Sequence, residues 1–194
     1  MSRHFALKTV LVLLLLTASL VVMVGMKQYT LNTGKVILLK TIPVDPRSLF
    51  RGDYVRLNYD ISRIKIDEVD GDKDFNRHQK IFVVLVKGEK YWHVQSVHHQ
   101  PPVLRQDQLM LKGKVNYVGG YLWNPETRKS EKVKNLNVTY GIENYFVPEG
   151  QGRVLERVQR DDRVDIQVAV DKNGNAGIKG VLVNDQQRYV ETLF

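Results

Sequence analysis

Ser48 has a setting in which a serine hydroxyl could act as a nucleophile. It lies in the segment DPRSLFRGDYVRLNYDI, residues 45–61, where a loop of turn-forming residues leads into an alternating strand. A serine nucleophile needs a base, and a lysine can serve only if hydrophobic surroundings lower its pKa. The candidate lysines, Lys80 and Lys87, flank the apolar run at 81–86 and are expected at exposed strand ends. A dyad of Ser48 and a lysine is therefore kept as the alternative interpretation of this loop.

The same loop is also explained by the rules of chain folding. Pro46 fixes its own φ, Gly52 permits a sharp reversal, and Asp53 can accept backbone N–H bonds in a turn. The two arginines of the loop, Arg47 and Arg51, could pair with neighbouring carboxylates. We therefore interpret the loop as a structural turn ahead of a strand, and we predict that the chain is not an enzyme.

The histidines do not predict a metal site. His93 and His99 lie in one predicted strand and share a face only across six residues, about 20 Å, which one ion cannot bridge. The chain has no cysteine, which excludes thiolate ligands, disulfides and a cysteine nucleophile. We predict neither a metal nor a cofactor.

A second loop, TYGIENYFVPEGQGRVLE at residues 139–156, combines carboxylates with aromatic residues. Loops of this composition are common places for recognition. A second interpretation of this loop is a structural lid or a helix cap. A third is hydrolysis by paired carboxylates. The predicted partner or ligand contacts, taken from both loops, are Arg47, Arg51, Tyr140, Glu143, Tyr145, Phe146 and Glu149.

The net charge of +8 arises from 29 Lys and Arg against 21 Asp and Glu, and the basic residues are spread along the chain. Nucleic-acid binding usually requires a concentrated basic patch, so we predict no nucleic-acid partner. Scattered positive charge is compatible with attraction to anionic lipid headgroups.

The amino end predicts a membrane anchor that would position the rest of the chain. Residues 9–25, TVLVLLLLTASLVVMVG, carry no charge and follow Arg3 and Lys8. About 20 apolar residues span a bilayer, and basic residues favour the cytoplasmic side. A cleaved signal peptide is the alternative, although no A-x-A pattern follows the run. We expect the tip and anchor at 1–25 and, on a short tether, an extracytoplasmic domain at 26–194.

The strands of that domain show an internal echo. Val55, Leu57, Tyr59 and Ile61 fall on one face of a strand, and the same pattern recurs at Leu136, Val138, Tyr140 and Ile142. The offset from Tyr59 to Tyr140 is 81 residues. Alternatively, two β segments resemble each other by chance.

A predicted hairpin follows each strand of the echo. The first turns near Lys87–Lys90 and the second at Asp171–Asn175, where Asn173 and Gly174 tolerate positive φ. The inward residues of the first hairpin, Phe82, Val84, Val86, Val94 and Val97, would correspond to Ile166, Val168, Val170, Ile178 and Val181. The sequence predicts a mainly β domain of two similar sheet or barrel halves, about 35–118 and 119–194, formed by internal duplication.

The segment GDYVRLNY, residues 52–59, resembles the motif of the GDYXXLXY protein family at every specified position: Gly52, Asp53, Tyr54, Leu57 and Tyr59. The second loop and VDIQVAVDKNGNAGIKGVLV, residues 164–183, are also similar to that family. The resemblance implies a membrane-anchored bacterial envelope protein that is commonly encoded beside polytopic membrane proteins. It implies no reaction.

The segment around Ser48 also resembles the part of signal peptidase in which a serine shortly precedes Gly-Asp and a strand, but the Met-x-Pro context is missing. We therefore predict a non-catalytic binding or assembly module in the bacterial cytoplasmic membrane, single-pass with a cytoplasmic amino terminus. Its predicted partners are membrane lipid, through the helix, and a polytopic membrane protein. The alternative is a membrane-anchored serine peptidase with Ser48 as nucleophile.

Overall fold

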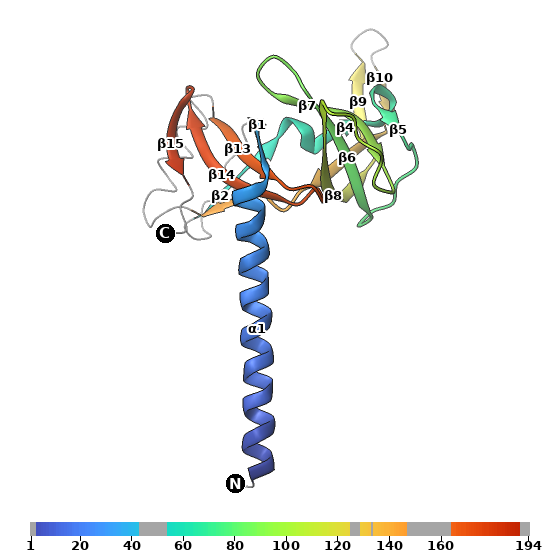
Figure 1. The fold of residues 1–194 in the computed structure, drawn as a ribbon. Helices are drawn as coiled ribbons and strands as arrows, with labels where there is room; N and C mark the ends of the chain where they lie inside the picture. The colour runs from blue at the N-terminus through green and yellow to red at the C-terminus, as the bar shows by residue number, and fades with distance from the viewer. Residues whose placement is uncertain (1–2, 43–53, 125–128, 133, 147–163, 191–194) are drawn as a thin grey trace.

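The computed structural model describes residues 3–42, 54–124, 129–132, 134–146 and 164–190. One long helix, α1 (Arg3–Thr33), projects from a domain built of strands (Figure 1). The predicted fold class, an N-terminal apolar helix followed by a mainly β domain, is confirmed.

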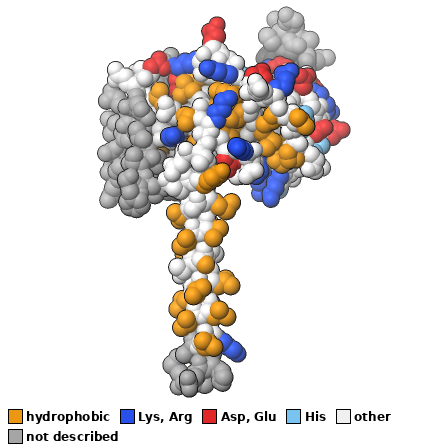
Figure 2. Space-filling view, viewed as in Figure 1, with side chains coloured by type: hydrophobic (Ala, Val, Ile, Leu, Met, Phe, Trp, Pro, Cys, Tyr) orange, Lys and Arg blue, Asp and Glu red, His pale blue; other side chains and the backbone are white. Residues whose placement is uncertain are grey.

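Helix α1 is apolar on all sides. Its large hydrophobic side chains from Phe5 to Val24 are more than half exposed, and they cover the visible face of the helix below the domain (Figure 2). The hydroxyls of Thr9, Thr17 and Ser19 donate to carbonyls of the preceding turn, so these polar groups are satisfied within the helix. The stretch Leu7–Thr33 is long and apolar enough to span a membrane.

The first sheet has five strands in the order β15-β14-β13-β1-β3. Its members are β1 (Lys35–Ile42), β3 (Asn58–Tyr59), β13 (Val164–Val170), β14 (Ala176–Val183) and β15 (Gln186–Val190). All its pairings are antiparallel. The sheet thus combines strands from both ends of the domain's sequence.

The second sheet is a curled half-barrel in the order β4-β11-β8-β6-β7-β5. Its members are β4 (Arg63–Lys65), β5 (Asp70–Gly71), β6 (Lys80–Lys87), β7 (Trp92–His98), β8 (Gln108–Val118) and β11 (Asn135–Thr139). Two smaller pairs are β2 (Tyr54–Arg56) with β12 (Asn144–Phe146), and β9 (Tyr121–Asn124) with β10 (Lys129–Lys132). Two 3-10 turns, Asp60–Ser62 and Ile66–Glu68, flank β4.

One hydrophobic core joins the two sheets. Leu39 of the first sheet and Leu111 of the second are both fully buried within it. The inward faces predicted for the two echoing strands are confirmed where side chains are described: Leu57, Tyr59, Ile61, Leu136, Val138, Tyr140 and Ile142 are all buried.

The predicted inward face of the first hairpin is displaced by one residue in β6, whereas in β7 Val97 is in the core and Val94 packs against it. Ile81, Val83 and Leu85 are fully buried, whereas Phe82 and Val86 are only half-buried. On the opposite face of β6, Val84 is also buried and Phe82 and Val86 are half-buried, so both faces are partly covered and alternation does not reveal the inner one. In the second hairpin Gly174 has positive φ, but Asn173 does not.

The two echoing segments run antiparallel to each other with two-fold symmetry. Val55 pairs with Tyr145 at one end, and Ile64 pairs with Leu136 at the other. Shifting each pair by the 81-residue offset converts one pairing into the other. The sheets repeat this relation, because β14-β13-β1-β3 matches β7-β6-β8-β11 in order.

The symmetry does not follow the predicted halves. The first sheet takes β1 and β3 from residues 35–118, and the second takes β11 from residues 119–194. Each sheet therefore contains strands of both predicted halves. Internal duplication remains a prediction, because symmetric pairing describes the present fold and not its origin.

Candidate functional site at the helix–domain junction

Much of the predicted motif loop lies outside the described residues. These positions are Arg47, Ser48, Arg51, Gly52 and Asp53, and Glu149 of the second loop also lies outside them. The backbones of Tyr54 and Phe146 pair with each other between β2 and β12, but their side chains are outside the described set. The roles predicted for these residues remain predictions.

Tyr59, the last tyrosine of the motif, and Tyr140, its counterpart in the repeated pattern, form reciprocal buried hydrogen bonds that act as a structural lock. The hydroxyl of Tyr59 donates to the carbonyl oxygen of Ile142 at 2.6 Å, and the hydroxyl of Tyr140 donates to that of Ile61 at 2.6 Å. Burial, reinforced by the nearby Glu143 carboxylate, raises the pKa of both phenols. Both therefore stay protonated and act as hydrogen-bond donors inside the core.

Glu143 closes the turn that follows the second tyrosine. Its carboxylate accepts the backbone N–H of Tyr140 at 2.5 Å and that of Gly141 at 3.0 Å. Its carbonyl accepts the N–H of Leu57 at 2.7 Å, which ties the turn to the motif strand. Tyr145 is also buried. The described members of the predicted contact set thus have structural roles, and partner contact through them remains a prediction.

The described lysines do not favour the peptidase alternative. Lys80 and Lys87 are the first and last residues of β6, and both are exposed, as the sequence predicted. Neither lysine therefore has the hydrophobic surroundings that a lysine base requires. Within the described ranges, no group of three or more His, Asp or Glu side chains is placed to hold a metal ion.

A charged cluster joins the first hairpin to the first sheet. The fully buried carboxylate of Asp165 in β13 accepts the hydroxyl of Tyr91 at 3.0 and 2.9 Å and pairs with Lys90 at 3.1 Å. Lys90 also pairs with Asp185. Burial, together with the hydrogen bond to Asp165, raises the pKa of Tyr91. The cluster is an internal fastening between the sheets.

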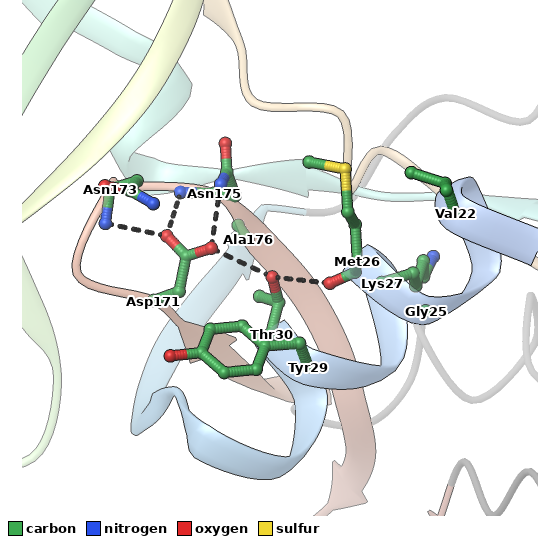
Figure 3. Close-up of a pocket in the computed structure, with 10 residues that line it drawn as sticks. All are labelled: Val22, Gly25, Met26, Lys27, Tyr29, Thr30, Asp171, Asn173, Asn175 and Ala176. Atoms are coloured by element: carbon green, nitrogen blue, oxygen red, sulfur yellow. Dashed lines mark hydrogen bonds between the residues drawn. The ribbon is translucent and has the colours of Figure 1, made fainter. Parts of the chain in front are cut away.

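The pocket that the sequence analysis missed lies where α1 meets the β13–β14 turn, as shown in Figure 3. It has a volume of about 520 Å³. One wall is a face of the helix that carries Val22, Met26 and Tyr29, and the other wall is the polar turn with Asn173 and Asn175. The pocket therefore has an apolar side and a polar side.

Asp171 organises the polar wall. One carboxylate oxygen accepts the backbone N–H groups of Asn173 and Asn175, each at 2.9 Å. The other accepts the Asn175 side-chain amide at 2.7 Å and the Thr30 hydroxyl at 3.0 Å. Burial alone would raise the pKa of Asp171, but the hydrogen bonds from Asn175, Thr30 and Asn173 together lower it. The carboxylate is thus ionised and fully engaged inside the protein.

The contact between Thr30 and Asp171 is one part of a fixed joint. Thr30 and Leu31 are buried in the domain, and the N–H of Gly34 donates to the carbonyl of Thr30 at 2.9 Å. A Cβ on Gly34 would lie 2.5 Å from that carbonyl oxygen, and a Cβ on Gly177 would lie 2.8 Å from the Leu31 side chain. Gly34 must be glycine because its Cβ would collide with backbone, whereas a Cβ on Gly177 would require the Leu31 side chain to shift.

The joint corrects the expected tether. The helix does not end near Gly25 but continues to Thr33, and β1 begins at Lys35. The polar residues after Met26 permitted either a flexible link or more helix, and packing of Thr30 and Leu31 against β13 and β14 favours helix. The DKNGN sequence indicated the turn, but no local signal connected it to a helix more than 100 residues earlier.

The family model that describes the GDYXXLXY protein matches residues 16–181, which is most of the chain. No curated protein and no solved structure matches the chain. The matched region includes the last part of α1, the motif strand, its echo and both hairpins. The chain therefore belongs to the GDYXXLXY protein family.

Proposed function

We propose that this protein is a non-catalytic binding and assembly module that is held against the bacterial cytoplasmic membrane. The observation that carries the proposal is the fixed joint between α1 and the β domain. Thr30, Leu31 and Gly34 fasten the helix to β13 and β14, so the domain has a set orientation relative to the helix. A rigid support of this kind suits a surface that must meet a neighbour in the same membrane.

The helix itself offers the first contact surface for such a neighbour. The most apolar part of this helix has no buried residue, and its large side chains from Leu7 to Val24 are more than half exposed. Lipid or another helix must cover it. Confinement to the membrane plane raises the effective concentration of a membrane neighbour, so weak contacts can be sufficient. We infer a polytopic membrane protein as that partner.

The topology in this proposal places the amino terminus in the cytoplasm and the β domain outside. Arg3 and Lys8 precede the apolar run and support this orientation through the positive-inside rule. Because the natural chain has no cysteine, Lys65→Cys introduces a single thiol at an exposed site. A reagent that cannot cross the cytoplasmic membrane should label this thiol in intact cells with a permeabilised outer membrane. Labelling only after lysis would refute the orientation.

Site-specific photocrosslinking tests the assembly role. A crosslinking residue at Leu14, which is exposed on the helix, should give one discrete adduct with a membrane protein in living cells. The matched control is Val103, which is exposed on the β domain away from the helix. With the crosslinking residue kept at position 14, replacing the other residues of 9–24 with an unrelated apolar sequence should remove the adduct while leaving the protein in the membrane. Recovery of uncrosslinked chain alone from both positions would refute a stable membrane partner.

A further inference from the structure

We propose that the pocket between α1 and the β13–β14 turn binds one phospholipid molecule with an anionic headgroup. The inference rests on the membrane placement in the proposed function and does not depend on a protein partner. It combines the height of the pocket in the membrane, the chemistry of its two walls and the charges at its rim.

The height follows from the charges on the helix. Lys8 and Lys27 bound an uncharged run at residues 9–26, about 27 Å of helix at 1.5 Å per residue. That length matches the hydrocarbon core of a bilayer, about 30 Å. The pocket extends along the helix from Val22 to Thr30, so it straddles the boundary between the acyl chains and the headgroups.

The β domain stands too close to the membrane for this pocket to open into bulk water. Thr33, the last helical residue, lies only about 10 Å beyond Met26. The headgroup layer accounts for most of that height, because it is roughly 5–8 Å thick on each side. The β13–β14 turn therefore reaches into the headgroup layer, and lipid is the molecule present at the mouth of the pocket.

The two walls match the two parts of a phospholipid. Val22 and Met26 are exposed and apolar, and they lie where an acyl chain would run along the helix. Gly25 leaves open space beside them, since a Cβ there would meet no atom within 4 Å. Asn173 and Asn175 form the polar wall beyond them. Tyr29 lies at the level where aromatic residues typically anchor a protein at the membrane interface.

The charges favour an anionic headgroup. Lys27 lines the pocket, Lys172 is exposed in the same turn, and Lys112 donates from β8 to the Asn175 side chain at 3.1 Å. The one carboxylate among the lining residues, Asp171, already accepts four hydrogen bonds. Among the lining residues Lys27 balances Asp171, so the excess positive charge beside the pocket comes from Lys172 and Lys112 next to the turn.

The test counts the lipids that the full chain retains. The protein is placed in nanodiscs of equal parts phosphatidylglycerol and phosphatidylcholine, released, and weighed by native mass spectrometry. We expect one retained phosphatidylglycerol per chain. Gly25→Leu should abolish this retention by filling the open space, while Val24→Leu adds bulk at a position that does not line the pocket and should have no effect. Lys27→Gln should lower the preference for phosphatidylglycerol about fivefold.

Several outcomes would overturn the proposal. One is equal retention of the two lipids by the natural chain, and another is undiminished phosphatidylglycerol on Gly25→Leu. Displacement by excess inorganic phosphate would show a free-anion site in place of a lipid site. A photocrosslinker at Met26 that reacts in cells with a protein and not with lipid would show that a partner helix occupies the pocket. The Leu14 adduct is independent of these results, so the two proposals can fail separately.

Discussion

Removing the hydroxyl of Tyr59 or Tyr140 tests whether the family's tyrosine is a structural lock. The substitutions Tyr59→Phe and Tyr140→Phe keep the ring and delete one oxygen. Each leaves a buried carbonyl oxygen, of Ile142 or Ile61, without the donor that now lies 2.6 Å away. A buried acceptor left without its partner costs about 1–3 kcal/mol. We therefore expect each variant to lose about 1–3 kcal/mol of unfolding free energy.

The measurement is urea unfolding of the full chain in detergent micelles. Trp92 is buried in the second sheet, so its fluorescence reports the loss of the β domain's core. The matched control is Tyr117→Phe, because the Tyr117 side chain is largely exposed and lies outside the hydrophobic core. This control should change the unfolding free energy by less than about 0.5 kcal/mol.

Two results would refute the reasoning. If both buried variants match the natural chain within about 0.5 kcal/mol, the hydroxyls do not hold the strands together. If only Tyr59→Phe is destabilised, the reciprocal arrangement of the two tyrosines is wrong. A requirement for the Tyr59 hydroxyl in partner crosslinking at unchanged stability would instead indicate a direct functional role.

Three further predictions concern the joint and its turn. Gly34→Ala should lower the unfolding free energy by about 1–3 kcal/mol, because its Cβ would collide with the Thr30 carbonyl. The control, Gly25→Ala, should be neutral or slightly stabilising. Equal effects of the two substitutions in the same urea assay would contradict the close packing proposed for the joint. Asp171→Asn should make the unfolding free energy fall less steeply as the pH is lowered. The pKa of Asp171 is lowered in the folded state, so the ionised carboxylate contributes its full stabilisation above the unfolded-state pKa near 3.9. That stabilisation disappears as the pH falls through the lower folded-state pKa. Urea midpoints measured from about pH 5 to pH 2 check this, and parallel curves for the two proteins would be inconsistent with it. Gly174→Ala should cost about 1 kcal/mol in urea unfolding because Gly174 has a φ of 81°, and a neutral result would show that the turn relaxes easily.

The local elements were predictable because their signals are local. Residues 9–25 lie within a helix as predicted, and the two hairpins turn at the predicted places. The alternation through Leu57 and Tyr59 identified the buried face, since one side of that segment faces solvent and the other faces the core. Composition and periodicity therefore gave the fold class.

The arrangement of strands was not predictable from such signals. The echo at an offset of 81 residues pointed to two similar segments, but not to a fold in which each sheet borrows strands from the other predicted half. Strand pairing over long sequence separations depends on the whole core. The one-residue error at Phe82 has a related cause, because β6 is covered on both faces and its alternation carries little information.

The pocket was not predictable because its two walls meet only in the folded chain. Thr30 stands 141 residues before Asp171, and neither residue belongs to a recognised motif. Ser48 and the carboxylate loop stand out in the sequence because a serine hydroxyl and paired carboxylates are groups with known catalytic roles. A threonine near the end of an apolar helix and an aspartate opening a hairpin turn give no such signal.

Helix α1 continues into the first sheet without a flexible link, so the helix fixes the rotational orientation of the whole β domain about the helix axis. One residue inserted between Lys27 and Thr30 would swing every surface of the β domain by about 100° around the helix axis, with a lift of only about 1.5 Å. Four inserted residues would leave the domain about 40° from its original orientation and about 6 Å higher. The length of α1 in residues therefore determines which surface of the β domain faces a neighbouring protein in the bilayer.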